Sequence, residues 1–117
     1  MDTSQTLIVP ASSGNATPRI RKTVLLVASG PLQGREFPIE KDAFVIGSAP
    51  NADLRLEDSS VSRRHCEIRA DERGYGIADL ESTNGTFVNG VRIASGFLNP
   101  GAEIQLGTTR IVFSPTM

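Results

Sequence analysis

The stretch EIQLGTTRIVF, residues 103–113, alternates apolar and polar side chains on both sides of a glycine. A period of two puts every second side chain on the same face of a β-strand. Ile104 and Leu106 precede the glycine, and Ile111 and Phe113 follow it, so each arm has one apolar face. The pattern predicts two strands joined by a tight turn and packed on a common core.

Short apolar runs separated by turn residues continue back along the chain to Thr23. They include TVLLVAS (23–29), AFVIG (43–47), GYGIADL (74–80) and TFV (86–88), and no longer segment keeps the spacing of an amphipathic helix. Strands at this spacing predict an all-β domain of two antiparallel sheets packed face to face. The last strand, near 109–113, is expected to pair with the first, near 24–27.

Size and charge narrow the classes of function. A chain of 117 residues fits one domain. Twelve Lys and Arg against thirteen Asp and Glu give a net charge of −1, so the broad positive field that draws proteins to nucleic acid or anionic membranes is absent. We therefore expect no direct binding of nucleic acid or membrane, and any anion site must be local.

The cysteine content and the amino-terminal residues suggest a compartment. One cysteine cannot form an internal disulfide, which fits a reducing environment. The apolar run at 7–9 is too short for a signal peptide or a membrane span. We expect a cytoplasmic protein whose isolated domain is a monomer.

Composition divides the chain into a tail and a domain. Residues 1–22 are rich in Ser and Thr and are expected to form a flexible tail, residues 23–114 the domain, and residues 115–117 its C-terminal end. Phosphorylation of Thr3, Thr6 or Thr17 would give the domain a segment of its own chain to bind. The alternative is an unstructured linker.

Residues 59–68, SSVSRRHCEI, contain the only histidine and the only cysteine. Neighbours on a strand point to opposite faces, so His65 and Cys66 are poorly placed to act as a nucleophilic pair. One His and one Cys also fall short of the ligands of a zinc site. We expect Cys66 to be a small buried hydrophobe, and we expect no metal, no cofactor and no catalysis.

A pocket for an anion remains as the interpretation of the polar residues. A second polar stretch, DLESTNGTFVNG at 79–90, follows a later predicted strand, and loops of a sandwich cluster at its ends. Ser62, Arg63, Thr83 and Asn84 would place hydroxyls, a guanidinium and an amide at one rim, which suits phosphate. The alternative is that the two Asn-Gly pairs are only hairpin turns.

At these residues the chain resembles the forkhead-associated (FHA) domains, over roughly 23–114. The resemblance rests on Gly47-Ser48, on the run Ser62-Arg63-Arg64-His65, on Asn84-Gly85, and on STNGTFVNG at 82–90. It implies a sandwich of eleven strands whose loops at one end bind a phosphothreonine peptide, without catalysis. The kinases that phosphorylate such partners are Ser/Thr protein kinases.

The resemblance also implies roles for individual residues. Ser62 corresponds to the phosphate-binding hydroxyl and Arg63 to a supporting cation. Thr83 corresponds to a second hydroxyl on the phosphate and Asn84 to the amide that holds the peptide backbone. The implied structural residues are Gly47, His65, which braces the loops, and Gly85, which lets the chain turn. Ser60 falls where the family often reads the third residue after the phosphothreonine.

Ser48 departs from the family, which has an arginine after its glycine. A guanidinium grips phosphate through two parallel hydrogen bonds, whereas a serine offers one neutral donor. Loss of a bond of about 1.5–3 kcal/mol would weaken binding by roughly one to two powers of ten. Either Arg63 or Arg64 compensates, or the domain recognises a partner through loop shape without phosphate.

Longer stretches at 46–65 and 98–113 resemble the amino-terminal FHA modules of bacterial AAA+ enhancer-binding transcription activators. This implies a sensor domain that responds to Ser/Thr kinase signalling and controls an ATPase. The alternatives are a free-standing adaptor and a phosphate-independent protein-interaction domain.

Overall fold

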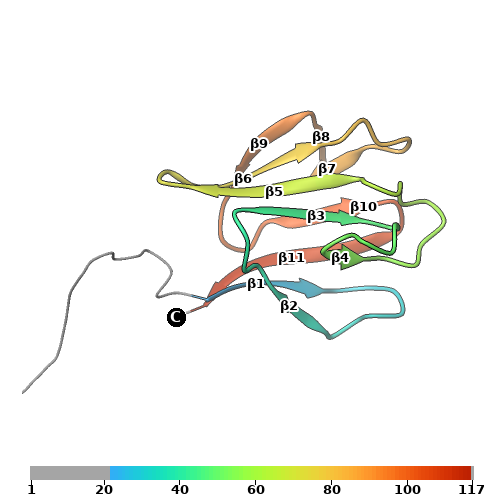
Figure 1. Cartoon of the computed structure of the whole chain (residues 1–117), viewed down its shortest axis with the longest axis horizontal. Coiled ribbons are helices and arrows are strands. Elements are labelled where there is room, and N and C mark those ends of the chain that lie inside the picture. Colours follow the sequence, from blue (N-terminus) through green and yellow to red (C-terminus); the bar gives the residue numbers. More distant parts are fainter. Residues whose placement is uncertain (1–21, 117) are drawn as a thin grey trace, which may run out of the picture.

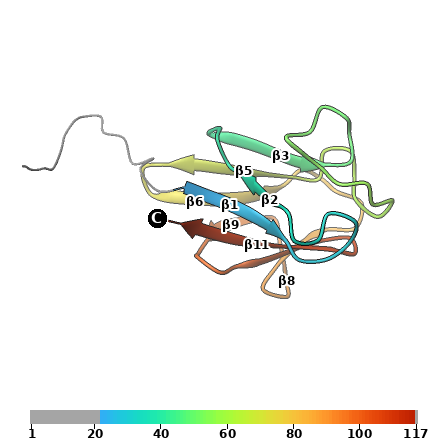
Figure 2. The same ribbon diagram turned by 90° about the horizontal axis from the view of Figure 1, so that it is seen from below.

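The computed structural model describes residues 22–116, which form eleven strands in two packed sheets (Figures 1 and 2). The six-stranded sheet has the order β2-β1-β11-β10-β7-β8, with β1 Lys22–Val27, β2 Glu36–Pro38, β7 Thr86–Val88, β8 Val91–Ile93, β10 Glu103–Leu106 and β11 Thr109–Thr116. The five-stranded sheet has the order β4-β3-β5-β6-β9, with β3 Ala43–Gly47, β4 Leu54–Arg55, β5 Cys66–Asp71, β6 Gly74–Asp79 and β9 Ser95–Leu98. The expected eleven-stranded sandwich is confirmed.

The first and last strands pair as expected. β1 and β11 are antiparallel, with Leu25 opposite Phe113 and Val27 opposite Ile111. β10 and β11 form the hairpin predicted by the stretch 103–113. The antiparallel expectation needs one correction, because β3 and β4 are parallel. A short loop leaves β3 and brings the two-residue β4 back alongside it, which antiparallel hairpin reasoning does not predict.

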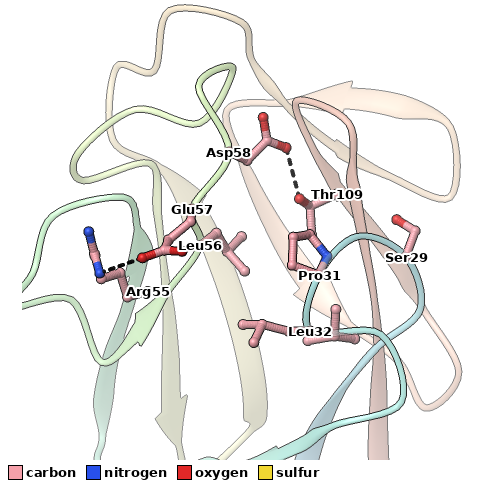
Figure 3. A pocket seen from close by; sticks show the side chains of 9 residues that line it. Ser29, Pro31, Leu32, Arg55, Leu56, Glu57, Asp58 and Thr109 are labelled. Carbon is pink, nitrogen blue, oxygen red and sulfur yellow. Dashed lines mark hydrogen bonds and ion pairs between the residues drawn. The ribbon is translucent and has the colours of Figure 1, made fainter.

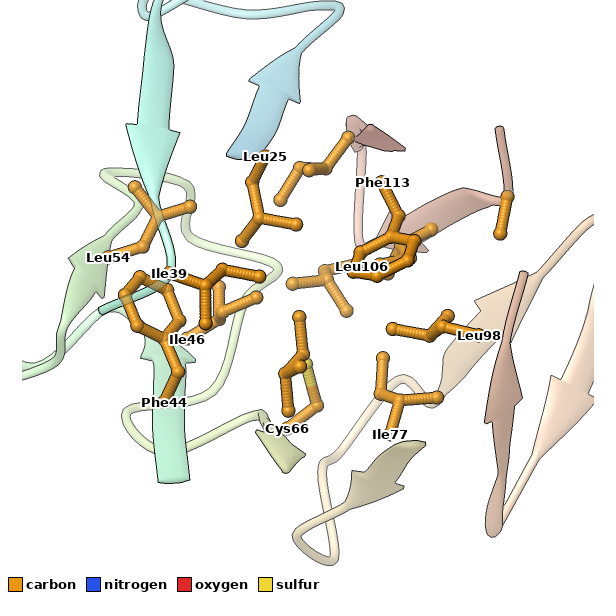
Figure 4. Close-up of a cluster of buried hydrophobic side chains, with 14 of the residues drawn as sticks. Leu25, Ile39, Phe44, Ile46, Leu54, Cys66, Ile77, Leu98, Leu106 and Phe113 are labelled. Carbon is orange, nitrogen blue, oxygen red and sulfur yellow. The ribbon is translucent and has the colours of Figure 1, made fainter. Parts of the chain in front are cut away.

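The core lies between the sheets and contains the alternating residues (Figure 4). Leu54, Ile68, Ile104 and Phe113 are each at most 1% exposed, so the period-two pattern located the buried face correctly. Cys66 is fully buried in the same cluster, which confirms that it packs as a hydrophobe. The buried residues come from both sheets, so the side chains of the two inner faces form one common core.

Of the two Asn-Gly pairs, only one forms a hairpin turn. Asn89 and Gly90 join β7 to β8 with φ values of +51° and +84°, as a turn of type I′ requires. Asn84 and Gly85 instead lie in the loop that precedes β7. The pair at 89–90 is therefore a hairpin turn, in which Asn89 also exchanges two hydrogen bonds with the backbone of Glu103, whereas the pair at 84–85 belongs to a longer loop.

The first and last strands extend slightly beyond the expected limits of the domain, residues 23–114. β1 begins at Lys22 and β11 extends to Thr116, two residues past the expected end of the domain at 114. Residues 22–116 contain no helix, and therefore none long and apolar enough to cross a membrane. The predicted tail with Thr3, Thr6 and Thr17 lies outside the described residues.

Candidate functional site

Two loops that are distant in sequence meet at one end of the sandwich, on the right in Figure 1. They are the β4–β5 loop, residues 56–65, and the β6–β7 loop, residues 80–85. The backbone N–H of Thr83 donates to the Ser62 hydroxyl at 3.0 Å. The side-chain amide of Asn84 donates to the Ser60 carbonyl at 2.9 Å. The structure thus brings together the polar residues that the sequence analysis selected from both stretches.

His65 connects the same two loops from the interior. Its side chain is fully buried. Nδ1 accepts the backbone N–H of Ser62 at 3.0 Å, and Nε2 donates to the Gly85 carbonyl at 2.9 Å. Because Nδ1 must accept, this pair of bonds assigns the proton of the neutral ring to Nε2. His65 therefore provides the internal bracing that the resemblance implies.

The end of β3 supports the β4–β5 loop. The backbone N–H groups of Ser48 and Ala49 donate to the carbonyls of Ser62 and Arg63 at 2.9 and 3.1 Å. A Cβ at Gly47 would lie 1.9 Å from the Arg63 carbonyl oxygen, so only glycine allows this approach. The Ser48 hydroxyl makes no hydrogen bond within residues 22–116. It is half-buried beside the loop that carries Ser62.

The solvent-facing side of these loops carries unused donors. Arg63, Arg64 and Thr83 are exposed, and within residues 22–116 their side chains make no hydrogen bond or ion pair. Arg55 differs, since its guanidinium donates to the Ser48 carbonyl at 3.3 Å and to Glu57 at 2.9 Å. Exposed guanidinium groups and hydroxyls on two loops that meet suit a doubly charged oxyanion such as phosphate.

Arg92 is a neighbour of the site that the sequence analysis missed. Gly85 has a φ of +92°, and a Cβ added there would lie 2.8 Å from Nε of Arg92, so the guanidinium packs directly on Gly85. No ion pair engages Arg92 in the described part of the chain. The signal was available, because a two-residue turn at 89–90 places Arg92 opposite Phe87, near the start of β7.

Asp79 shapes the β6–β7 loop from within and was also missed. Its carboxylate accepts the hydroxyls of Ser82 at 2.6 Å and Thr86 at 2.7 Å, and the Ser82 hydroxyl in turn accepts the N–H of Gly85 at 2.9 Å. Burial raises the pKa of Asp79, but the hydrogen bonds from Ser82 and Thr86 outweigh it, and the pKa lies below its ordinary value. The loop is therefore held in one conformation before any ligand binds.

Ser60 lies in a second network, with Asp58. Its hydroxyl donates to the Asp58 carboxylate and accepts the N–H of Thr108 at 3.2 Å. The same carboxylate accepts the hydroxyls of Thr108 and Thr109, each at 2.8 Å. A Cβ at Gly107 would lie 2.1 Å from the Ser60 hydroxyl oxygen. The Ser60 side chain is thus engaged inside the protein, and its role in peptide selectivity stays a prediction.

A cavity of about 290 Å³ lies beside this network, between the loop after β1 and the β4–β5 loop (Figure 3). Leu32 and Leu56 form part of its apolar lining. Its charged lining consists of Arg55, Glu57 and Asp58. Neither Ser62 nor Thr83 lines this cavity, so it is separate from the rim that carries them.

Cys66 offers no chemistry to the site. Burial raises the pKa of its thiol, and the negative charge of Asp79 acts in the same direction. The thiolate is the nucleophilic form of cysteine, so this side chain is inert. Within residues 22–116, no three His, Cys, Asp or Glu side chains gather in a group that could hold a metal ion.

Comparison with known proteins agrees with this geometry. The family model described as "Inner membrane component of T3SS, cytoplasmic domain" matches residues 26–117. A solved structure described as "Structural and functional analysis of phosphothreonine-dependent FHA domain interactions" is 38% identical, with a TM-score of 0.74, and the match covers 80% of this chain and 95% of that one. The chain therefore belongs to the family of that model and, through its identity to the solved structure, to the FHA domains.

Its named relatives are regulators. The oxoglutarate dehydrogenase inhibitor of Corynebacterium diphtheriae is 37% identical over 88% of this chain and 72% of its own length. The glycogen accumulation regulator GarA of Mycobacterium tuberculosis is 38% identical over 77% of this chain and 56% of its own. These names describe inhibitors and regulators, in agreement with a binding module rather than an enzyme.

Proposed function

We propose that this FHA domain binds a phosphothreonine-containing segment of a partner protein at the rim formed by the β4–β5 and β6–β7 loops. The observation that carries the proposal is the hydrogen bond between Ser62 and Thr83, 3.0 Å long. Arg63 follows Ser62 in the chain, and its exposed guanidinium makes no hydrogen bond or ion pair within residues 22–116. Residues 21 positions apart in sequence share this rim through one hydrogen bond. This hydrogen bond holds the two loops together before a ligand binds, which lowers the cost of binding.

Each donor has a task in the proposed complex. The Ser62 hydroxyl accepts from Thr83, so its own proton is free to point at a phosphate oxygen. The Thr83 hydroxyl supplies a second neutral donor, and Arg63 a charged one. The Asn84 amide carries one more N–H and a carbonyl oxygen beyond its bond to Ser60, which suits the backbone of an extended peptide. The cations Arg64 and Arg92 add local positive potential.

Ser48 sets the expected strength of binding. Its hydroxyl is a weaker phosphate ligand than the guanidinium that the family has at this position. Arg55 is held by Glu57 and by the Ser48 carbonyl, so it does not replace that group in the structure as it stands. The proposed binding is therefore weak but dependent on phosphate.

Calorimetric titration with three peptides of one sequence tests the proposal. The peptides carry phosphothreonine, phosphoserine or threonine at the central position. Phosphothreonine is expected to bind at least about tenfold more tightly than threonine, because one charge-assisted hydrogen bond alone is worth about 1.5–3 kcal/mol. Equal affinity for phosphothreonine and threonine across a peptide library would contradict the proposal. Thr83→Val, which removes only a hydroxyl, serves as the site variant.

The relatives favour a free-standing regulator over part of a transcription activator. The match to the inhibitor of C. diphtheriae fills 72% of that protein, which leaves little room there for a separate ATPase. We therefore propose that this domain acts as an adaptor in the cytoplasm, downstream of a Ser/Thr kinase, and controls oxoglutarate dehydrogenase by binding it, since the C. diphtheriae relative is named as an inhibitor of that enzyme. The purified domain should change the activity of oxoglutarate dehydrogenase from the same cells, and an unchanged rate at saturating domain would contradict this role.

A further inference from the structure

The outer strands of the two sheets differ in their protection against pairing with another strand. Exposed edges in natural proteins are protected by charged residues, by proline or by being very short. β2 contains Glu36 and Pro38. β4 has two residues, one of them Arg55, and β8 contains Arg92. β9, with the sequence SGFL, is also an edge strand but has neither charge nor proline.

The backbone of β9 is open to solvent. Ser95, Gly96 and Phe97 are all exposed. The N–H of Asp79 donates to the Ala94 carbonyl at 2.9 Å. This bond shows which of the opposite residue pairs between β6 and β9 are hydrogen-bonded pairs. In an antiparallel pair, every second residue of a strand exchanges hydrogen bonds with its opposite residue. Gly96 is two residues after Ala94, so its N–H and C=O also point toward β6. Ser95 and Phe97 turn theirs outward, where residues 22–116 offer no further strand.

A shallow hollow of about 270 Å³ lies on the outer face of the sheet beside this edge. Gly76, Ala78 and Ser95 give it small side chains or none, Phe97 forms part of the lining, and the charged residues Glu67, Arg69 and Asp71 of β5 line it as well. The Phe97 side chain is 64% exposed, although the guanidinium of Arg73 lies 5.6 Å from its ring centre. An exposed aromatic ring beside a hollow that is lined by small and by charged residues is typical of an interaction surface.

One arrangement of two copies uses both the open backbone groups of β9 and the hollow beside it. A two-fold axis through Gly96 pairs Ser95 of each copy with Phe97 of the other, so the outward backbone groups form hydrogen bonds. Ser95 is opposite Ala78 on β6, so the ring of the second copy then lies over Ser95 and Ala78, inside the hollow. A register that pairs Phe97 with Phe97 leaves both hollows empty.

We propose that β9 is a self-association surface through which two copies of this chain form one continuous sheet of ten strands. Each copy contributes a five-stranded sheet, and each Phe97 ring fills the hollow of the other copy. A net charge of −1 gives little repulsion between copies. The contact is small, so association is weak and depends on concentration. This proposal departs from the sequence-based expectation of a monomer.

Association through β9 leaves the candidate binding site uncovered. Ser62 and Thr83 lie on loops at the strand ends, whereas the proposed contact involves the strand edge and the outer face of the sheet. The dimer therefore presents two binding sites. A partner with two phosphothreonines gains avidity from such a dimer without any new contact.

Sedimentation velocity on the whole chain, from low micromolar to near-millimolar concentration, tests the proposal. The wild-type mass is expected to rise from one chain toward two, and Phe97→Ser is expected to remain at one chain. Val91→Ser is the matched control, since Val91 is 62% exposed on the edge strand of the other sheet. It should associate like the wild type.

Ser95→Lys provides a second variant that places a charge on the edge and removes no apolar contact. It should also stay monomeric, with the circular dichroism spectrum and phosphopeptide affinity of the wild type. The proposal is overturned by a wild-type chain that stays monomeric throughout, or by association that Phe97→Ser and Ser95→Lys leave intact. Neither result bears on phosphopeptide binding, which the titration measures separately.

Discussion

The backbone N–H of Thr83 donates to the Ser62 hydroxyl at 3.0 Å and thereby joins the two loops of the candidate site. The hydroxyl that the resemblance assigns to phosphate is therefore also a structural acceptor. Its oxygen is held in place by one partner, and its proton remains available. This double use makes Ser62 the residue on which loop geometry and ligand chemistry depend together.

Ser62→Ala removes both the acceptor of the Thr83 N–H and the hydroxyl proton available to phosphate. Phosphopeptide affinity should fall by about tenfold or more, since a hydrogen bond to a charged group contributes about 1.5–3 kcal/mol. Calorimetric titration measures the affinity. Ser59→Ala, an exposed neighbour in the same loop, is the control and should bind like the wild type. Unchanged affinity in Ser62→Ala would show that the hydroxyl does not touch the phosphate.

Substitution of His65 should destabilise the whole domain. His65→Ala leaves the partly buried N–H of Ser62 and the buried Gly85 carbonyl without their partner. An unsatisfied buried group costs about 1–3 kcal/mol, so urea unfolding should show a loss of about 2–4 kcal/mol. Arg64→Ala, next to it but exposed, should change stability by less than about 0.5 kcal/mol. If the two substitutions lower the free energy of unfolding equally, His65 does not brace the loops.

Ser48→Arg should strengthen binding of a phosphothreonine peptide by about tenfold, because a guanidinium can make two charge-assisted hydrogen bonds to phosphate. The threonine peptide should gain nothing. Asn51→Arg adds the same charge at an exposed position of the same loop and controls for general electrostatic attraction. If both variants improve affinity equally, position 48 does not face the phosphate.

Asp58 should make stability depend on acid pH. Burial raises its pKa, but hydrogen bonds from Ser60, Thr108 and Thr109 outweigh this and hold the pKa well below its ordinary value of 3.8. The carboxylate therefore stabilises the fold fully above pH 3.8, and this contribution is lost as pH falls from there toward the depressed pKa.

Unfolding of the wild type and Asp58→Asn at a series of pH values measures this contribution. The difference in free energy between the two proteins should be constant near neutrality and shrink below pH 3.8. Asp71→Asn, an exposed carboxylate on β5, is the control. A difference that does not change with pH would show that the network does not depend on the charge of Asp58.

The strands and the core residues could be predicted from the sequence because both depend on the local alternation of apolar and polar residues. Alternation located strands and core, as at Ile104 and Phe113, because burial of one face imposes that period. The resemblance picked out Ser62, Thr83 and Asn84, which the fold brings to one end, although their roles toward a ligand stay predictions.

Contacts between distant residues were not predictable in the same way. Asp58 and Thr108 are 50 positions apart and meet only because the β4–β5 loop lies on the β10–β11 turn. The parallel pairing of β3 with β4 also depends on packing rather than on local pattern. The position of Arg92 was predictable only in part. The turn at 89–90 determines its register opposite Phe87, but its packing on Gly85 depends on the fold.

The most direct test of the central claim is to follow the backbone amide signals by NMR while a phosphothreonine peptide is added. If the two loops form the phosphate site, the amides of Ser62, Thr83 and Gly85 should shift, and those of the β5–β6 turn at residues 72–73, at the opposite end of the sandwich in Figure 1, should not. Shifts confined to that turn or to β9, with the loop signals unchanged, would contradict the account.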